Sequence, residues 1–271
     1  MYSGLQPNTT LWRRMKLPPP GGMDDYMVSE INSAIQLVWD APEQDDPGGP
    51  ISWFDVNTAM FFPYDKYIKK QFSAGTSRLT GCTMLIVFNH KAAYIAHYWE
   101  SLAFATDRSD IAWQTYTTQQ EIFKARILDG LEHGADENKQ HTQDALKGPN
   151  ADLLNDADVR AFLIRPSHRH DEDQSQPGPG QGYRNYWDQI EDAVNSYIPE
   201  LDKKGAEGWV EHVYSPLNEE DLDTEDQLQR TARGRFLFKW DEKHARTKRS
   251  LIKLYSESTE VYSEDWPAPI V

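Results

Sequence analysis

The chain has 271 residues, and 38% of them are hydrophobic, so it is long enough to bury one large core or two smaller ones. Its 43 acidic residues outnumber its 28 lysines and arginines, and the formal net charge of -15 repels nucleic acid and anionic membrane surfaces. The single cysteine cannot form an internal disulfide, and neither a signal peptide nor a membrane-spanning apolar run is evident. We therefore expect a cytoplasmic protein without nucleic-acid or membrane partners, and export by an unconventional route stays open.

The first 22 residues combine prolines and glycines with a small basic cluster, a composition that cannot continue a helix or strand. We expect segment 1–22 to be a flexible arm and residues 23–271 to form a single α+β domain. At the start of that domain, apolar residues recur at intervals of three and four over 24–40, as on one face of a helix. The acidic, Pro- and Gly-rich stretch 41–50 ends this predicted helix.

Two nearly continuous apolar segments follow, at 82–88 and 92–98, separated by a short polar sequence around Asn89 and His90. Both segments are rich in β-forming residues and lack the alternation of a half-exposed strand. They predict a β-hairpin that is buried on both faces.

The rest of the chain alternates between helix and strand patterns. A helix is expected from Thr118, because Glu121 stands three residues later as in a capping box, and it should end near Gly134. The further elements are a strand at 159–164, a helix at 187–198 and strands at 209–214, 235–240 and 250–255, with polar loops at 166–182 and 218–227. Together these elements predict an α+β fold, in which a layered mixed β-sheet or sandwich core contains the buried hairpin and is flanked by helices.

The hairpin carries the only cysteine of the chain, Cys82, and a histidine, His97, on the neighbouring strand. If Asn89 and His90 form a two-residue turn, counting outward along both strands places Cys82 directly opposite His97. Opposed residues have Cβ atoms about 4.5 to 5.5 Å apart, close enough for a thiol to interact with an imidazole. A nearby imidazolium lowers the pKa of a thiol and holds a proton for a leaving group, so the pair could act in nucleophilic catalysis.

Residues around Cys82 are candidates for supporting roles. Gly81 lacks a Cβ and would let a substrate carbonyl approach the backbone, where the Cys82 amide could hold an oxyanion. Three threonines nearby offer hydroxyls that could orient the imidazole or bind substrate, namely Thr76, Thr80 and Thr83. A structural role stays open, because cysteine is commonly a buried packing residue and a one-residue register shift would send His97 to the opposite face.

The segment from Thr76 to His97, with the tetrad Leu79-Thr80-Gly81-Cys82, resembles the core motif of the cysteine-dependent glutamine deamidases. This group comprises the cytotoxic necrotizing factors, Burkholderia lethal factor and the chemotaxis receptor deamidase CheD. Its members present Leu-Ser-Gly-Cys or a similar tetrad at a strand start, with the catalytic histidine on a following strand. In two of the three a threonine precedes the cysteine by six residues, as Thr76 does here. The likeness is confined to this segment, and threonine replaces the serine of the toxins.

The resemblance implies a cysteine-dependent amidohydrolase, a toxin-like or effector protein that converts glutamine of a protein substrate to glutamate through a thioester. An amine in place of water would give transglutaminase chemistry. The implied catalytic residues are Cys82, His97 and Thr76, with Gly81, Thr80 and Thr83 near the substrate or oxyanion. No cofactor or metal is implied. The runs Gly-Cys-Thr and Ala-His-Tyr-Trp-Glu also resemble uncharacterised filamentous-fungal proteins, and the alternative function is a non-enzymatic interaction protein with a structural Cys/His pair.

Other candidate sites are less complete. His168 and His170 stand beside three acidic residues, but no second ligand cluster with zinc-like spacing accompanies them. Glu100 and Asp107 follow His97 and could orient it through a hydrogen bond, although acidic residues after a strand are commonly exposed. A papain-like protease would have its histidine far downstream of the cysteine, which the short spacing here disfavours.

Overall fold

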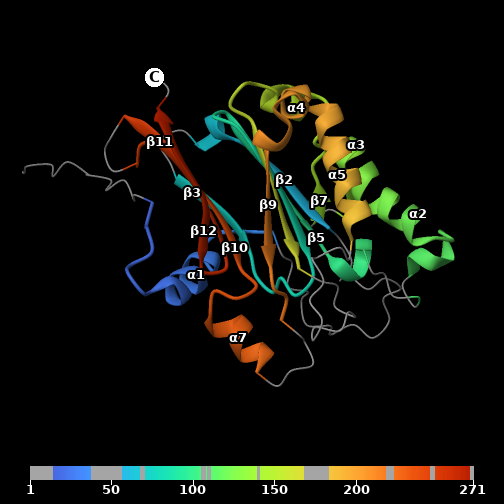
Figure 1. The fold of residues 1–271 in the computed structure, drawn as a ribbon, viewed down its shortest axis with the longest axis horizontal. Coiled ribbons are helices and arrows are strands. Elements are labelled where there is room, and N and C mark those ends of the chain that lie inside the picture. Colours follow the sequence, from blue (N-terminus) through green and yellow to red (C-terminus); the bar gives the residue numbers. More distant parts are fainter. Residues whose placement is uncertain are drawn as a thin grey trace, which may run out of the picture.

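The fold consists of two mixed β-sheets packed together and several helices, which confirms the predicted layered α+β class (Figure 1). It is known from a computed structural model. The structure describes residues 15–37, 57–67, 71–104, 108, 111–138, 141–167, 183–217, 223–244 and 248–268. Among these residues, no helix is both long and apolar enough to cross a bilayer.

The larger sheet contains the predicted hairpin at its centre. Its strands, in spatial order, are β6 (Ala135–Asn138), β7 (His141–Gln143), β2 (Thr58–Pro63), β5 (Ala92–Tyr98), β4 (Thr83–Phe88), β8 (Arg160–Pro166) and β9 (Trp209–Tyr214). Strand β2 pairs with β7 in parallel, β8 pairs with β9 in parallel, and the other neighbours are antiparallel. Every residue of β4 and β5 is buried, as predicted.

The smaller sheet is built mostly from the C-terminal part of the chain. Its spatial order is β1 (Ile35–Gln36), β3 (Gln71–Thr76), β10 (Phe236–Asp241), β11 (Arg249–Ser256) and β12 (Thr259–Pro267). Strand β1 runs parallel to β3, and the remaining pairs are antiparallel.

The helices lie mainly on one side of the larger sheet (Figure 1). They are α2 (Gln119–Phe123), a π-helical turn (Lys124–Leu128), α3 (Asp129–His133), α4 (Pro149–Leu154), α5 (Arg184–Tyr197) and α6 (Pro199–Lys204). Helix α1 (Met23–Ile31) packs on the far face of the smaller sheet, and α7 (Thr224–Arg230) lies near one end of the sandwich. Short turns complete the set at Tyr64–Tyr67, Glu100–Phe104, Ile111–Gln114 and Gly205–Glu207.

Alternating side chains of the hairpin pack into two different hydrophobic cores. One set, which includes Leu85, Val87 and Tyr94, packs against the helices. The other set, which includes Met84, Ile86 and Ile95, packs against the smaller sheet. This two-sided burial explains why the hairpin sequence is apolar without alternation.

The register of the hairpin differs from the prediction by two residues. Phe88 pairs with Ala93, and Met84 rather than Cys82 lies opposite His97. The side-chain oxygen of Asn89 accepts hydrogen bonds from the amides of residues 91 and 92, at 2.8 and 3.0 Å, and this widens the turn. Because side chains alternate with a period of two, the shift keeps the cysteine and the histidine on the same face.

Most of the other predicted elements are present with shifted ends. The capping box is confirmed, since Thr118 and Glu121 exchange the expected hydrogen bonds at the start of α2, and the helical segment ends at Gly134. The predicted helix over 24–40 is wrong over residues 32–37, because the chain turns after Ile31 and joins the smaller sheet as β1, and residues 38–40 lie outside the described part.

Two predicted loops have different outcomes. Residues 168–182, with the histidine pair His168 and His170, lie outside the described residues. The stretch 218–227 is wrong as a loop where it is described, because α7 begins at Thr224, whose side chain is buried. At the chain start, Met15 is buried and its amide donates to Asp241 at 3.0 Å, while residues 1–14 are outside the described part.

Candidate active site

The candidate residues lie where the chain crosses from one sheet to the other. Thr76 ends β3 in the smaller sheet, and Cys82 directly precedes β4 in the larger one. The crossing is anchored at Arg78, which has a φ of 65° and binds Glu225 with two nitrogens at 2.9 and 2.7 Å. The amide of Leu79 donates to the carbonyl of Gly234 at 2.9 Å, so the segment before the cysteine is held from two sides.

His97 is fully buried and its Nδ1 atom has two oxygen neighbours. The carbonyl oxygen of Leu37 lies at 3.1 Å and the Thr76 hydroxyl at 3.4 Å. A carbonyl oxygen can only accept, so Nδ1 carries the proton and donates to Leu37. Leu37 is itself positioned by its amide, which donates to the carbonyl of Gly75 at 2.8 Å.

The other ring nitrogen of His97, Nε2, is buried and has no hydrogen-bond partner among the described residues. With Nδ1 protonated, Nε2 presents a lone pair. Burial lowers the pKa of His97 to about 4, although the hydrogen bond to the Leu37 carbonyl acts in the opposite direction. The imidazolium expected from the sequence is therefore not the resting form at neutral pH, and the site holds a neutral base.

Cys82 belongs to the core between the two sheets and is 4% exposed. It lies two positions before Met84, the partner of His97, and is therefore a diagonal neighbour of the histidine on the same face. Its backbone carbonyl accepts a 2.7 Å hydrogen bond from the buried hydroxyl of Tyr214. The pKa of Tyr214 is raised well above its usual value by burial first and then by the charges of Cys82 and Glu100.

Gly81 is in close contact with a buried carboxylate. A Cβ at this position would lie 1.6 Å from Oε2 of Glu100, so any residue larger than glycine requires the Glu100 carboxylate to move. The other carboxylate oxygen accepts a 2.5 Å hydrogen bond from the hydroxyl of Tyr183. The ladder pairs Thr83 with Tyr98, so continuing it outward brings residues 81 and 100 together. Glu100 thus packs on the cysteine segment, and no hydrogen bond from it to His97 is seen among the described contacts.

The three threonines of the prediction have different surroundings. Thr76 lies beside the imidazole, as described. Thr83 is on the helix side of the sheet, where its hydroxyl accepts a 3.0 Å bond from the indole nitrogen of Trp187. Thr80 lies in the crossing segment and is 9% exposed. The structure therefore brings Thr76, Cys82 and His97 to one face, and it turns Thr83 to the other.

Three residues near the pair had no signal in the sequence analysis. Leu37 acts through its backbone carbonyl, which any residue type supplies. Tyr183 and Tyr214 lie about a hundred or more positions away from Cys82 and approach it only through the packing of α5 and β9. Within the part of the chain that the structure describes, no group of three or more potential metal ligands occurs.

Comparisons with known proteins add little. No protein-family model matches the chain, and no curated protein matches it. Among solved structures, the chain is similar to the C-terminal domain of CNFy from Yersinia pseudotuberculosis, with 14% identity and a TM-score of 0.29. The alignment covers 77% of this chain and 58% of that one, so this chain corresponds to little more than half of that domain. A likeness at this level carries no argument about function.

Proposed function

We propose that this chain is a cysteine-dependent amidohydrolase that converts glutamine side chains of a protein substrate to glutamate. One observation carries the proposal. The proton of Nδ1 of His97 is committed to the Leu37 carbonyl, which leaves Nε2 as a buried lone pair on the face that Cys82 shares. A nucleophile, a base of defined tautomer and an oxygen that orients the base are the three parts of cysteine and serine hydrolase sites.

The acylation half of the reaction follows from these groups. Nε2 of His97 takes the proton of the Cys82 thiol, and Sγ forms a bond to the carboxamide carbon of the glutamine. The carbonyl electrons move to oxygen, where the backbone amide of Cys82 stabilises the negative charge. When the electrons return, the C–N bond breaks and Nε2 gives its proton to the nitrogen, so that ammonia leaves. A thioester on Cys82 remains.

Deacylation uses the same residues in reverse. Nε2 takes a proton from water, the hydroxide oxygen attacks the thioester carbon, and the C–S bond breaks. The sulfur recovers the proton from His97, and the product is a glutamate side chain. If a primary amine replaces water, an isopeptide-type amide forms instead, which is a transglutaminase side activity.

The surroundings restrict how a substrate reaches the thiol. Glu100 already fills the space beside Gly81, so the carboxamide must approach the Cys82 amide from a different side. Thr76 lies 3.4 Å from Nδ1 and supports the orientation of the ring. Residues 23–271 are proposed to act as one catalytic domain, and the negative charge of the chain favours a basic protein surface as substrate.

The experiment is an assay on dimethylated casein as a general glutamine protein, with ammonia release and peptide mass spectrometry as readouts. We expect glutamine-to-glutamate conversion by the wild type and a loss of roughly 100-fold or more in Cys82→Ser and in His97→Gln, because each variant lacks a reacting group. Thr76→Val should cause a smaller loss. Hydroxylamine added to the reaction should release a hydroxamate from the thioester.

Two results would contradict the proposal. If Cys82→Ser converts glutamine as fast as the wild type, the activity comes from elsewhere or from a contaminant. If the wild type gives neither ammonia nor a trapped thioester, with a panel of basic proteins as well as casein, the amidohydrolase assignment fails. Tyr64→Phe is the matched control, because Tyr64 is equally buried and is a tyrosine of the inter-sheet core that this mechanism does not use.

The second candidate is a non-enzymatic interaction protein in which Cys82 and His97 are packing residues. The observation that favours it is their burial, 4% and 0% exposed. In that case the thiol of the folded protein should not react with small alkylating reagents. Substitution of a surface residue should not make it reactive as long as the fold is intact.

A further inference from the structure

Trp99 directly follows β5 and has a firmly anchored backbone. Its amide donates to the side-chain oxygen of Asn57 at 2.9 Å, and the side-chain nitrogen of Asn57 donates to the carbonyl of Arg126 at 3.2 Å. Asn57 is 2% exposed, so this anchor is protected from water. Any motion of Trp99 is therefore confined to its side chain.

The indole of Trp99 lies on the imidazole of His97. The ring centroids are 5.0 Å apart and the planes are inclined by 28°, an approximately stacked arrangement. His97 is completely buried, whereas Trp99 is partly exposed, so the indole has one face on the imidazole and part of its surface in water. It also packs against both hydrophobic cores of the larger sheet.

The register brings the same side chain to the cysteine. The last pair of the β4–β5 ladder is Thr83 with Tyr98, and the next positions outward are Cys82 and Trp99. Side chains at opposed positions point to the same face. Trp99 is thus next to His97 along its own strand and next to Cys82 across the hairpin.

We propose that the indole of Trp99 closes the Cys82–His97 site and determines which side chains enter it; this inference rests on the proposed function. In the closed arrangement the indole covers the pair, and rotation of the side chain admits the substrate while the backbone stays fixed by Asn57. The displaced indole then flanks the thiol, where its flat face packs against the two methylene groups of a glutamine. An asparagine, which is one methylene shorter, makes less of this contact.

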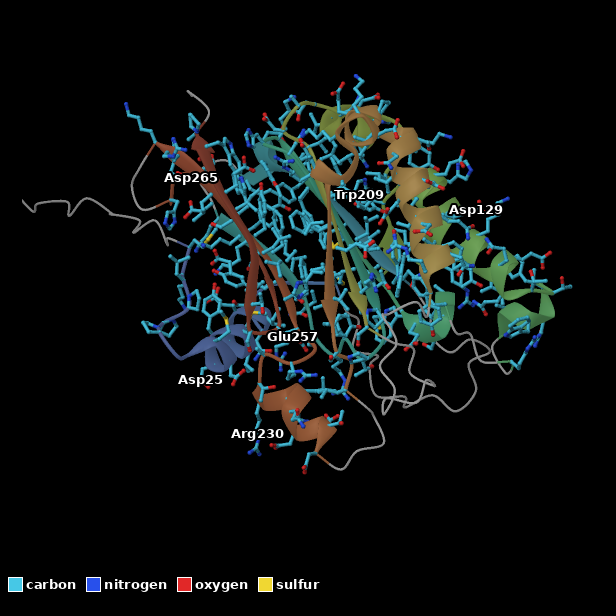
Figure 2. All side chains as sticks on the ribbon, viewed as in Figure 1. Asp25, Asp129, Trp209, Arg230, Glu257 and Asp265 are labelled. Carbon is cyan, nitrogen blue, oxygen red and sulfur yellow. The ribbon has the colours of Figure 1, made fainter. Side chains whose placement is uncertain are left out.

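The first test measures the rate of Cys82 alkylation by iodoacetamide in the folded protein. Trp99→Ala should increase the rate by roughly tenfold or more, because the rate follows the fraction of molecules in the open arrangement. Trp99→Phe should lie between Trp99→Ala and the wild type. Trp209→Ala is the matched control, since Trp209 is also partly buried and lies at the start of β9 beside α5, bonded to Asn195 (Figure 2).

The second test uses the glutamine assay and separates kcat from KM. Trp99→Ala should raise KM for a glutamine peptide several-fold more than it lowers kcat, and it should reduce the preference for glutamine over asparagine. Trp99→Phe should restore most of both quantities, because a smaller aromatic ring keeps the flat contact.

The outcomes are distinguishable from those of the proposed function. Suppose that no variant hydrolyses glutamine, but that Cys82 is alkylated faster in Trp99→Ala and not in Trp209→Ala. The role of Trp99 in closing the site is then supported, and the proposed reaction class is wrong. If glutamine is hydrolysed but Cys82 is alkylated in Trp99→Ala at the wild-type rate, Trp99 does not close the site. An equal acceleration in Trp99→Ala and Trp209→Ala would also overturn the proposal, because it would show general loosening of the fold. The unfolding free energy of each variant is measured alongside.

Discussion

The two histidines of the central hairpin lie at opposite ends of the sandwich and have opposite electrostatic surroundings. His90 is in the β4–β5 turn, and its ring stacks on Trp266 with centroids 4.3 Å apart and planes inclined by 8°. Its Nδ1 lies 3.1 Å from a carboxylate oxygen of Asp158, and its Nε2 lies 3.4 Å from one of Glu264. At the other end, His97 also stacks on an indole but has no carboxylate on either nitrogen among the described contacts.

The two ends can be followed along the outer strand of the smaller sheet. Figure 2 shows Asp265 near one end of β12, and Glu257 in the turn that precedes its other end. The His90 end contains Glu264 and Trp266. The Cys82 end is the one that carries Gly234 and Arg233, which binds Glu257 at 2.9 Å.

The surroundings move the pKa values of the two histidines in opposite directions. For His90, burial lowers the pKa, but the bond to Glu264 and the charges of Asp158 and Asp156 outweigh burial and raise it above 6.5. For His97, burial dominates and the pKa falls to about 4. The surroundings therefore favour the cationic form of His90 and the neutral form of His97, and a neutral imidazole is the form that accepts a proton from a thiol.

The largest expected effect is acid destabilisation through His97. Its folded pKa of about 4 lies below the unfolded value of 6.5, so the unfolded state binds more protons between these pH values. Since each tenfold change in proton affinity is worth about 1.4 kcal/mol, roughly 3 kcal/mol of unfolding free energy should be lost as the pH falls through this window. In urea unfolding between pH 7 and 4, the unfolding free energy of His97→Gln should depend less on pH than that of the wild type. Parallel profiles would contradict the prediction.

The next effect concerns the close packing at the Cys82 end. In Gly81→Ala the new Cβ collides with Glu100, whose carboxylate can move only by giving up the bond from Tyr183. Overpacking of this kind costs about 1–3 kcal/mol. Glu100→Ala in the same chain should recover part of the loss, so urea unfolding of the two single variants and the double variant should reveal a favourable coupling. Additive effects would show that Gly81 and Glu100 do not meet.

The smallest effect concerns the partly exposed His90 end. Because its folded pKa is raised, protonated His90 stabilises the fold below the unfolded value of 6.5, and this contribution is lost as the pH rises through the folded pKa. Solvent screening limits it to about 0.5–1 kcal/mol. His90→Gln should be less stable than the wild type at pH 5.5, and the difference in unfolding free energy should shrink by this amount as the pH rises well above the folded pKa. Asp158→Asn, which removes the carboxylate 3.1 Å from Nδ1 of His90, should reduce this difference.

Local sequence patterns determined a large part of this protein. Apolar continuity on both sides of Asn89 predicted a doubly buried hairpin, because a strand with two covered faces needs apolar side chains at every position. The Thr118 capping box predicted the start of α2 because its hydrogen bonds join residues three apart. The two-residue period also placed Cys82 and His97 on one face, and the error in turn length did not change this.

Only the tertiary structure decided the surroundings of that pair. The Leu37 carbonyl that orients His97 is a backbone atom, and the Tyr214 hydroxyl on Cys82 comes from a segment far away in the chain. The Glu100 carboxylate reaches Gly81 across the hairpin, and this contact depends on the register that the turn at Asn89 sets. The strands β1, β2, β3, β6, β7 and β12 were likewise missed. In β3 the polar residues Gln71 and Ser73 alternate with buried ones, and in β12 most side chains are exposed or half-buried, so neither strand shows an apolar run until its sheet neighbours are known. The opposite pKa shifts of His90 and His97 have the same origin, since a pKa depends on burial and on nearby charges, and both are set by packing between distant segments.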